Sequence, residues 1–308
     1  MIRTPRDAST AASIVDAMRA IANASPEERA SFARGRCVRG TYIPSDRAEE
    51  ITKSRSFTRP SRVLARFSAD GGGPRVADTD NATLRGLGFR LGDAGHHSDI
   101  LTQSAPIHYA RTLDQMLSLL KAHMPGPDGK PDLKKLNAFC AANPETLHQA
   151  NYMAAHPLPF SFAGTTYWAV HAFPATNSRG ETQFIKFKVV PVSSNDLLAG
   201  HKAGTSSADI LNGDLEKRIA TGDIRFSLMA LLGGPNDPTM DVTIRWPGED
   251  TREAVRLGTI VITAIEASET CDASPFNPTN LADGVGHPPD EIFAARRAAY
   301  TTSQAQRR

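Results

Sequence analysis

Residues 290–308 read DEIFAARRAAYTTSQAQRR. A proline pair before an acidic start and arginines toward the end are typical of a helix. On such a helix Arg296 and Tyr300 are one turn apart, Gln304 follows, and Arg307 returns to the same side. A phenol ordinarily titrates near about pH 10, so a tyrosine that ligates a metal needs the metal and a nearby cation to stay ionised. The Arg296–Tyr300 pair offers this arrangement, although the pair alone is more typical of a surface helix.

The composition is that of a globular protein of enzyme size. The 308 residues are 40% hydrophobic, and 35 basic residues against 33 acidic ones leave a net charge of +2. This balance favours a small-molecule ligand and gives no bulk field for nucleic acid. Cys37, Cys140 and Cys271 are far apart and lack a CxxC spacing, so they indicate neither a disulfide framework nor a zinc site. We expect three buried thiols in a reducing compartment.

The start of the chain and its hydropathy favour the cytoplasm. Residues 1–21 contain no uninterrupted apolar segment like that of a secretory signal peptide, and no stretch reaches the roughly 20 apolar residues of a membrane helix. We therefore expect a soluble cytoplasmic protein with no signal peptide and no membrane span. A homo-oligomer is compatible with the sequence, which does not fix the number of subunits.

Hydrophobic periodicity divides the chain into strands and helices. Apolar runs of strand length predict strands at 37–42, 63–68, 86–91, 99–102, 167–173, 183–192, 224–232 and 257–264. Turns are predicted at 71–74 and 177–180. Apolar positions at helical spacing predict helices at 11–22, 112–123, 133–142, 144–154 and 207–220, and a short helix that starts at 25–28.

This order of elements predicts an α+β fold in a single domain that spans residues 1–308. Strands that follow one another pair readily as antiparallel neighbours, and the helices between them pack outside, so we expect an antiparallel β-barrel surrounded by helices. Residues 1–35 would form a helical N-terminal arm and residues 112–155 a helical insertion. Residues 288–308 would form the helix that carries Tyr300.

Three stretches, in the same order, resemble the haem catalases and especially the short catalase-related peroxidases. Residues 66–91, RFSADGGGPRVADTDNATLRGLGFRL, resemble the family's RFS block and its following R-G-F segment. Residues 167–189, YWAVHAFPATNSRGETQFIKFKV, are similar to its G-S-H-T-F and N-x-x-G-E segments. Residues 275–300, PFNPTNLADGVGHPPDEIFAARRAAY, resemble the signature that ends in R-x-x-x-Y. The resemblance covers nearly the whole chain.

The resemblance implies a catalase-like barrel with haem b between the barrel and the C-terminal helix. Tyr300 would be the axial iron ligand, and Arg296 would be the cation that keeps it ionised. His171 would lie beside the pocket in a structural role. Further haem contacts are implied at Arg29, Arg66, Ser68, Met116 and Arg307. The arginines among them would pair with the propionates.

The family pattern is broken on the opposite face of the haem. Where the family carries a histidine that moves the proton for O–O cleavage, this sequence has Phe32, and no histidine precedes His96. Phenylalanine cannot transfer a proton, and losing a positioned acid–base typically slows a reaction by about 10²–10⁴. Gln103 stands where the family has an asparagine, and we expect its amide to donate a hydrogen bond. His108 and Tyr109 replace a Phe-Phe pair.

The sequence leaves three functions open, all with a small molecule as partner. We favour a haem peroxidase-like oxidoreductase that acts on an organic hydroperoxide, or on another organic substrate with a weak O–O or N–O bond, because these need less proton assistance than hydrogen peroxide. Its chemistry would be shaped by Phe32, Gln103 and Arg296. The alternatives are a slow peroxidase that uses hydrogen peroxide and a non-catalytic haem-binding protein.

Overall fold

The computed structural model describes residues 10–25, 27–70, 83–192 and 210–305. The strands in these ranges are β1 (Arg34–Pro44), β2 (Ser61–Ala69), β3 (Arg85–Leu91), β4 (Ser98–Gln103), β5 (Tyr167–Trp168), β6 (Phe173–Thr176), β7 (Thr182–Pro191), β8 (Ile224–Leu232) and β9 (Ala254–Ile265). The helices are α1 (Ala11–Ala22), α2 (Ala48–Ile51), α3 (Arg55–Thr58), α4 (Leu113–His123), α5 (Leu133–Ala142), α6 (His148–Ala155), α7 (Ile210–Thr221), α8 (Ser268–Ala273) and α9 (Glu291–Ala305), with a 3₁₀ turn at Pro144–Leu147.

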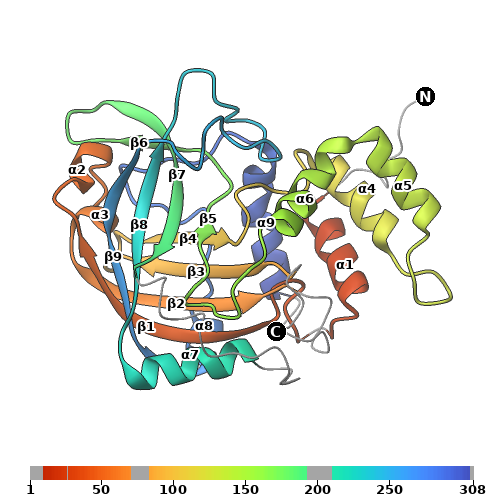
Figure 1. Ribbon diagram of the computed structural model, residues 1–308, viewed down its shortest axis with the longest axis horizontal. Coiled ribbons are helices and arrows are strands. Elements are labelled where there is room, and N and C mark those ends of the chain that lie inside the picture. The colour runs from red at the N-terminus through yellow and green to blue at the C-terminus, as the bar shows by residue number, and fades with distance from the viewer. Residues whose placement is uncertain (1–9, 26, 71–82, 193–209, 306–308) are drawn as a thin grey trace.

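The strands form a closed antiparallel barrel, as the sequence predicts. Neighbouring strands follow the order β5-β4-β3-β2-β1-β9-β8-β7-β6, and an additional pairing of β5 with β7 closes the barrel and leaves β6 outside the ring. Closure gives each strand of the ring two partners, which removes the exposed edges that promote aggregation. The barrel occupies one side of the molecule in Figure 1.

The alternation of side chains along β2 separates the core from the functional surface. Val63, Ala65 and Phe67 point into the barrel and are nearly inaccessible to solvent. Because successive side chains of a strand point to opposite faces, Arg66 and Ser68 point outward. Both line a cavity on the outside of the barrel. The strand register therefore determines which side chains reach this cavity.

Stacked aromatic side chains fill the barrel. Phe67 lies 5.5 Å from Phe162 and 5.9 Å from Phe226 between ring centroids, and Phe57 stacks on Phe187 at 5.3 Å. Full burial of such a side chain is worth roughly 1.5–3 kcal/mol. The core thus fixes the barrel wall on which the outward-pointing residues stand.

The helices α1, α4, α5 and α6 gather at one side of the barrel, and α9 runs between them and the strands (Figure 1). A capping box of Thr10 and Ser13 starts α1, which packs against both α4 and α9. The helix predicted from 25–28 does not form. Glu28 and Ser25 bond to each other as in a helix start, but the chain continues only as turns before β1 begins at Arg34.

Two of the three cysteines correct the sequence analysis. Cys37 on β1 and Cys271 on α8 form a disulfide with a Cα–Cα distance of 5.9 Å, and both are buried. Cys140 is free and partly buried. A sequence separation of 234 hides the proximity of the bonded pair, since α8 packs onto β1 only in the folded chain. The expectation of three thiols was wrong, and the argument for a reducing compartment loses its basis.

The other differences from the predicted elements are local. The strand predicted at 167–173 is split into β5 and β6, because the chain leaves the sheet after Trp168 and turns His171 toward α9. The turn predicted at 71–74 and the start of the helix predicted at 207–220 lie outside the described residues. None of the helices in the described ranges has the length and apolar character needed to cross a bilayer.

Candidate functional site

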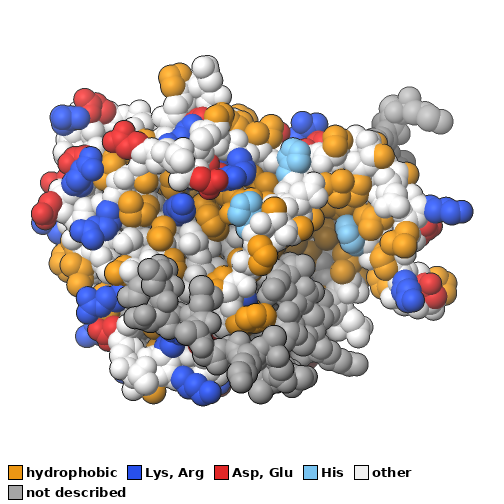
Figure 2. Space-filling model, viewed as in Figure 1, with side chains coloured by type: hydrophobic (Ala, Val, Ile, Leu, Met, Phe, Trp, Pro, Cys, Tyr) orange, Lys and Arg blue, Asp and Glu red, His pale blue; other side chains and the backbone are white. Residues whose placement is uncertain are grey.

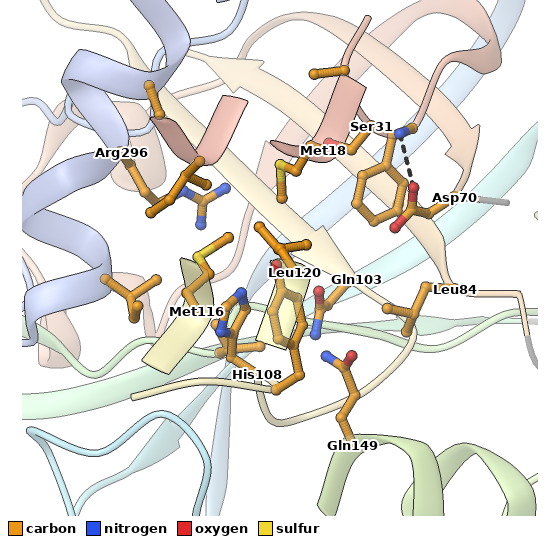
Figure 3. A pocket seen from close by; sticks show the side chains of 18 of the residues that line it. Met18, Ser31, Asp70, Leu84, Gln103, His108, Met116, Leu120, Gln149 and Arg296 are labelled. Carbon is orange, nitrogen blue, oxygen red and sulfur yellow. Dashed lines mark hydrogen bonds between the residues drawn. The ribbon is translucent and has the colours of Figure 1, made fainter. Parts of the chain in front are cut away.

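A cavity of about 1380 Å³ lies between the outer face of the barrel and the helices α1, α4 and α9. It exceeds the roughly 300–1,000 Å³ of an ordinary small-molecule pocket. Hydrophobic side chains gather on the surface between the barrel and the helical part of the molecule (Figure 2). In Figure 3, Arg296 lies on one side of the cavity, and Asp70, Leu84 and Gln149 lie on the other.

On the α9 side, Arg296 and Tyr300 come together as predicted. They are one helical turn apart, and Arg296 Nη2 donates to the Tyr300 hydroxyl oxygen over 2.9 Å. The guanidinium carbon lies 5.4 Å from the centroid of the tyrosine ring. Tyr300 lines the cavity. A cation is therefore bonded to the phenol oxygen from within the same helix.

His171 and Asp290 extend this pair into a chain of hydrogen bonds. Arg296 Nη1 donates to His171 Nε2 over 3.0 Å, and His171 Nδ1 bonds Asp290 Oδ2 over 2.9 Å. Arginine has no acceptor, so Nε2 must accept and the proton lies on Nδ1, which donates to the carboxylate. Asp290 also accepts from the backbone N–H of Phe293 over 2.9 Å in the first turn of α9.

The hydrogen-bonded groups His171 and Asp290 are buried, and each shifts the pKa of the other. The side chains of His171 and Asp290 are 2% and 0% exposed. Burial lowers the pKa of His171, although the hydrogen bond to Asp290 opposes the shift. Burial alone would raise the pKa of Asp290, but the bond from His171 and the nearby positive charges outweigh it and hold that pKa below its usual value. A neutral imidazole thus orients Arg296 toward Tyr300.

Arg29 and Arg66, the arginines expected to bind haem propionates, line the cavity, and each also bonds to another group of the protein. Arg29 lines the cavity and forms an ion pair with Asp272. Arg66 Nη1 and Nη2 donate to the carbonyl oxygens of Phe32 and Ala33 over 2.9 and 2.8 Å. Arg307, the third predicted arginine, lies outside the described residues.

The wall around Phe32 is built by backbone contacts. Phe32 has a φ of 51°, in the left-handed region that non-glycine residues rarely adopt. Its carbonyl accepts from Arg66, and its N–H donates to Asp70 Oδ1 over 3.2 Å. A Cβ at Gly86 would come within 3.1 Å of the ring of Phe32 and 2.8 Å of Ser68 Oγ. Glycine therefore makes room for the aromatic ring beside Ser68.

Gln103 differs from its predicted orientation. Its Nε2 donates to the carbonyl oxygens of Ala105 and Ile107 over 3.3 and 2.8 Å, so both amide hydrogens are used by the backbone. Gln103 therefore turns an acceptor oxygen to the cavity where a donor was expected (Figure 3). Gln149 Nε2 bonds the same Ile107 oxygen over 2.8 Å. Met116 lines the cavity and is buried, and its contact with haem stays a prediction.

His108 lies in the cavity but is bonded away from the Phe32 wall. Its Nδ1 lies 2.9 Å from the Ala110 carbonyl oxygen, and its ring stacks on Tyr109 at 4.3 Å. Burial lowers the pKa of His108 to about 4, and the nearby charge of Arg296 adds to the shift. His108 is therefore neutral at neutral pH and lies toward the α9 side.

Two acidic residues were missed by sequence reasoning. The sequence indicates Asp290 as the start of a helix, where its side chain can cap the N–H of Phe293 three residues later. That pattern does not indicate the bond from Asp290 to His171. Asp70 follows β2 in RFSAD and lines the cavity. Only the fold brings Asp70 to Phe32, so no local pattern of residues indicates its position.

Comparisons with known proteins agree with this architecture. Residues 12–308 match the family model described as Catalase. A catalase-related peroxidase from Synechococcus elongatus is 28% identical over 285 residues, which are 91% of this chain and 83% of that protein. Another from Mycolicibacterium paratuberculosis is 28% identical over 295 residues, covering 94% of this chain and 92% of that protein.

Solved structures show the same fold. A fungal catalase superposes with a TM-score of 0.76 at 19% identity, covering 91% of this chain and 59% of the fungal chain. A bacterial catalase superposes with a TM-score of 0.75 at 21% identity, covering 91% of this chain and 57% of that chain.

Proposed function

The chain belongs to the catalase family, and on that premise we propose that this haem-dependent oxidoreductase acts on organic hydroperoxides and not by fast dismutation of hydrogen peroxide. A hydroperoxide ROOH and a two-electron organic donor AH₂ would give ROH, A and water. The atoms and electrons of this reaction balance without a further reagent.

The residues of the cavity fit a haem b group. Tyr300 presents a phenol oxygen already bonded to a guanidinium, which suits an anionic axial ligand. Arg29 and Arg66 lie in the lining where carboxylates need charged donors, and Arg307 would add a third. Ser68 and Met116 lie in the same lining, where they would contact the ring. We assign these residues to haem binding and Tyr300 to the iron.

Haem, when bound, supplies the redox centre that takes two oxidising equivalents from a peroxide. Arg296 holds its positive charge next to the phenol oxygen of Tyr300, and the His171–Asp290 pair fixes the orientation of the guanidinium. Such outer partners orient a ligand and tune the electron density that it donates. Hydrogen bonds from α9 and from His171, between β5 and β6, would thus tune the electron density that Tyr300 donates to the iron.

One observation carries the choice of substrate: Phe32 occupies the wall where the family's proton-transferring histidine is expected, in a backbone conformation held at both its N–H and its carbonyl. Fast dismutation of hydrogen peroxide needs a positioned base as strong as imidazole to move its proton, and a phenyl ring does not provide one. The volume of about 1380 Å³ and the apolar lining also leave room for an organic group next to the haem.

Steady-state kinetics on the haem-loaded protein test the proposal. We expect kcat/KM for cumene hydroperoxide, with an organic electron donor present, to exceed that for hydrogen peroxide by at least about tenfold. Phe32→His should raise oxygen release from hydrogen peroxide by about 10²-fold or more, because it restores an acid–base at that wall. Strong oxygen release from hydrogen peroxide by the parent protein would overturn the proposal. Turnover of no peroxide at all would favour a non-catalytic haem-binding protein.

A further inference from the structure

Asp70 is a carboxylate in the cavity that the proposed function does not yet use. It follows β2 and is held in place by a backbone bond from its N–H to the Leu84 carbonyl oxygen over 2.8 Å. Its side chain lines the cavity beside Phe32, whose N–H donates to it. It lies opposite Arg296 (Figure 3). The carboxylate therefore reaches the face of the cavity from which a proton-transferring histidine is missing.

Only one oxygen of Asp70 is used by the fold. Oδ1 accepts the hydrogen bond from the Phe32 N–H over 3.2 Å, which is the dashed line in Figure 3. Oδ2 makes no hydrogen bond and no ion pair with any of the described residues. A carboxylate fixed through one oxygen, with the other turned to a cavity, has the geometry of a positioned acid–base.

The groups around Asp70 neither neutralise nor replace it. Arg66, on the same strand, directs its guanidinium to the carbonyls of Phe32 and Ala33, and Arg29 pairs with Asp272. His108, from the segment before α4, is bonded to the Ala110 carbonyl, and Arg296 bonds Tyr300 and His171. Gln103 and Gln149 are uncharged. The described part of the chain thus leaves this carboxylate without a counter-ion.

Tyr109 faces the same carboxylate from the segment before α4. Its hydroxyl is buried and makes no hydrogen bond within the described ranges. Burial raises the pKa of Tyr109, and the negative charge of Asp70 raises it further, so the phenol stays protonated. Burial also raises the pKa of Asp70 above that of an ordinary carboxyl, although the bond from Phe32 opposes the shift. A carboxyl with such a shift exchanges its proton nearer to neutral pH, where a general acid–base is most effective.

We propose that Asp70 is the proton-transfer group of this cavity, in place of the histidine that Phe32 replaces. This inference rests on the proposed function: a carboxylate is a weaker base than the imidazole whose place it takes, and it serves an organic hydroperoxide because that substrate needs less proton assistance than hydrogen peroxide. Asp70 accepts the proton from the terminal oxygen of ROOH and returns it to the oxygen bonded to carbon as the O–O bond breaks. That oxygen keeps the electron pair of the broken bond and leaves as ROH. The terminal oxygen takes up the two electrons and two protons of the donor AH₂ and leaves as water. Asp70 ends the step ionised, as it began.

Cyanide binding to the haem-loaded protein tests the inference without any turnover. Hydrogen cyanide must give its proton to a base in the cavity when the anion binds the iron, so its association rate reports that base directly. We expect Asp70→Asn, which keeps an acceptor for the Phe32 N–H, to slow cyanide association at pH 7 by about 10²-fold or more. Asp114→Asn, the same change at an exposed position in the first turn of α4, should leave the rate within about twofold of the parent.

Two further variants guard against an indirect effect on folding. Asp70→Glu should recover part of the lost rate, because it restores a carboxylate one methylene longer. Phe32→His in the Asp70→Asn background should recover most of it, because a base returns to the same wall. An infrared band of a protonated carboxyl that titrates in the parent above the ordinary range of a carboxyl should disappear in Asp70→Asn. Cyanide association in Asp70→Asn at the parent rate would overturn the inference.

The two proposals fail in different ways. Turnover of an organic hydroperoxide together with unchanged cyanide binding in Asp70→Asn would overturn the role of Asp70 and leave the proposed function in place. Slow cyanide binding in Asp70→Asn, in a protein that turns over hydrogen peroxide alone, would support the role of Asp70 and overturn the choice of substrate.

Discussion

Replacing Arg296 with lysine should loosen the haem without unfolding α9, the helix that carries the proposed ligand Tyr300. Arg296 donates through Nη1 to His171 and through Nη2 to Tyr300, at 3.0 and 2.9 Å. A single lysine ammonium on a shorter stem cannot span both acceptors in that fixed fork. Loss of the bond to the phenolate is worth about 1.5–3 kcal/mol. At 1.4 kcal/mol per tenfold change, haem should dissociate about 10- to 150-fold faster.

The rate of haem transfer to an excess of apomyoglobin measures this effect. Arg297→Lys is the matched control, since Arg297 is the next residue on α9 and is exposed. We expect its haem dissociation rate to stay within about twofold of the parent. Equal rates for the Arg296→Lys and Arg297→Lys proteins would refute the reasoning, because they would show that the guanidinium next to Tyr300 does not stabilise the bound group.

Further predictions concern the ligand, the buried histidine and the disulfide. Tyr300→Phe should abolish the absorption spectrum of a phenolate-ligated ferric haem; an unchanged spectrum would assign the ligand elsewhere. Because burial lowers the folded-state pKa of His171 below the unfolded value of about 6.5, the unfolded chain takes up the proton first as the pH falls, and stability should decline below about pH 6.5. The thermal unfolding midpoint, measured from pH 7.5 to 5, follows this decline, which should be shallower in His171→Gln. Equal slopes of midpoint against pH in the two proteins would contradict the prediction. Reduction of the Cys37–Cys271 bond should cost about 2–4 kcal/mol of unfolding free energy, measured by urea denaturation with Cys37→Ser as the reference that reductant does not affect.

The barrel could be predicted because its strands are encoded locally. The predicted boundaries of 11–22, 133–142 and 224–232 coincide with α1, α5 and β8, where periodicity and caps point to the same ends. The prediction fails where a tertiary contact overrides the local pattern. The apolar run at 167–173 is typical of one strand, yet it breaks so that His171 can bond Asp290 and Arg296. The disulfide was missed for the same reason.

The candidate site was only half predictable, and the two halves differ in sequence separation. Arg296 and Tyr300 are four residues apart on one helix, so helix geometry alone brings them together. Asp70 and Phe32 are 38 residues apart and meet only because β1 and β2 pair antiparallel, with Gly35 opposite Ser68. No local pattern encodes that meeting.

The bond between Asp70 and Phe32 ties the shape of the cavity to its chemistry. A left-handed backbone at a bulky residue costs on the order of 1–3 kcal/mol, and a hydrogen bond to a carboxylate returns about 1.5–3 kcal/mol. The two magnitudes are comparable, so the carboxylate can hold Phe32 in this conformation with the help of Arg66 at the carbonyl. An apolar residue at position 70 would release the Phe32 N–H and also remove the carboxyl. The loss of a histidine at this wall and the presence of an acid beside it are therefore parts of one arrangement, in which the bond that fixes Phe32 also aims the second carboxylate oxygen into the cavity.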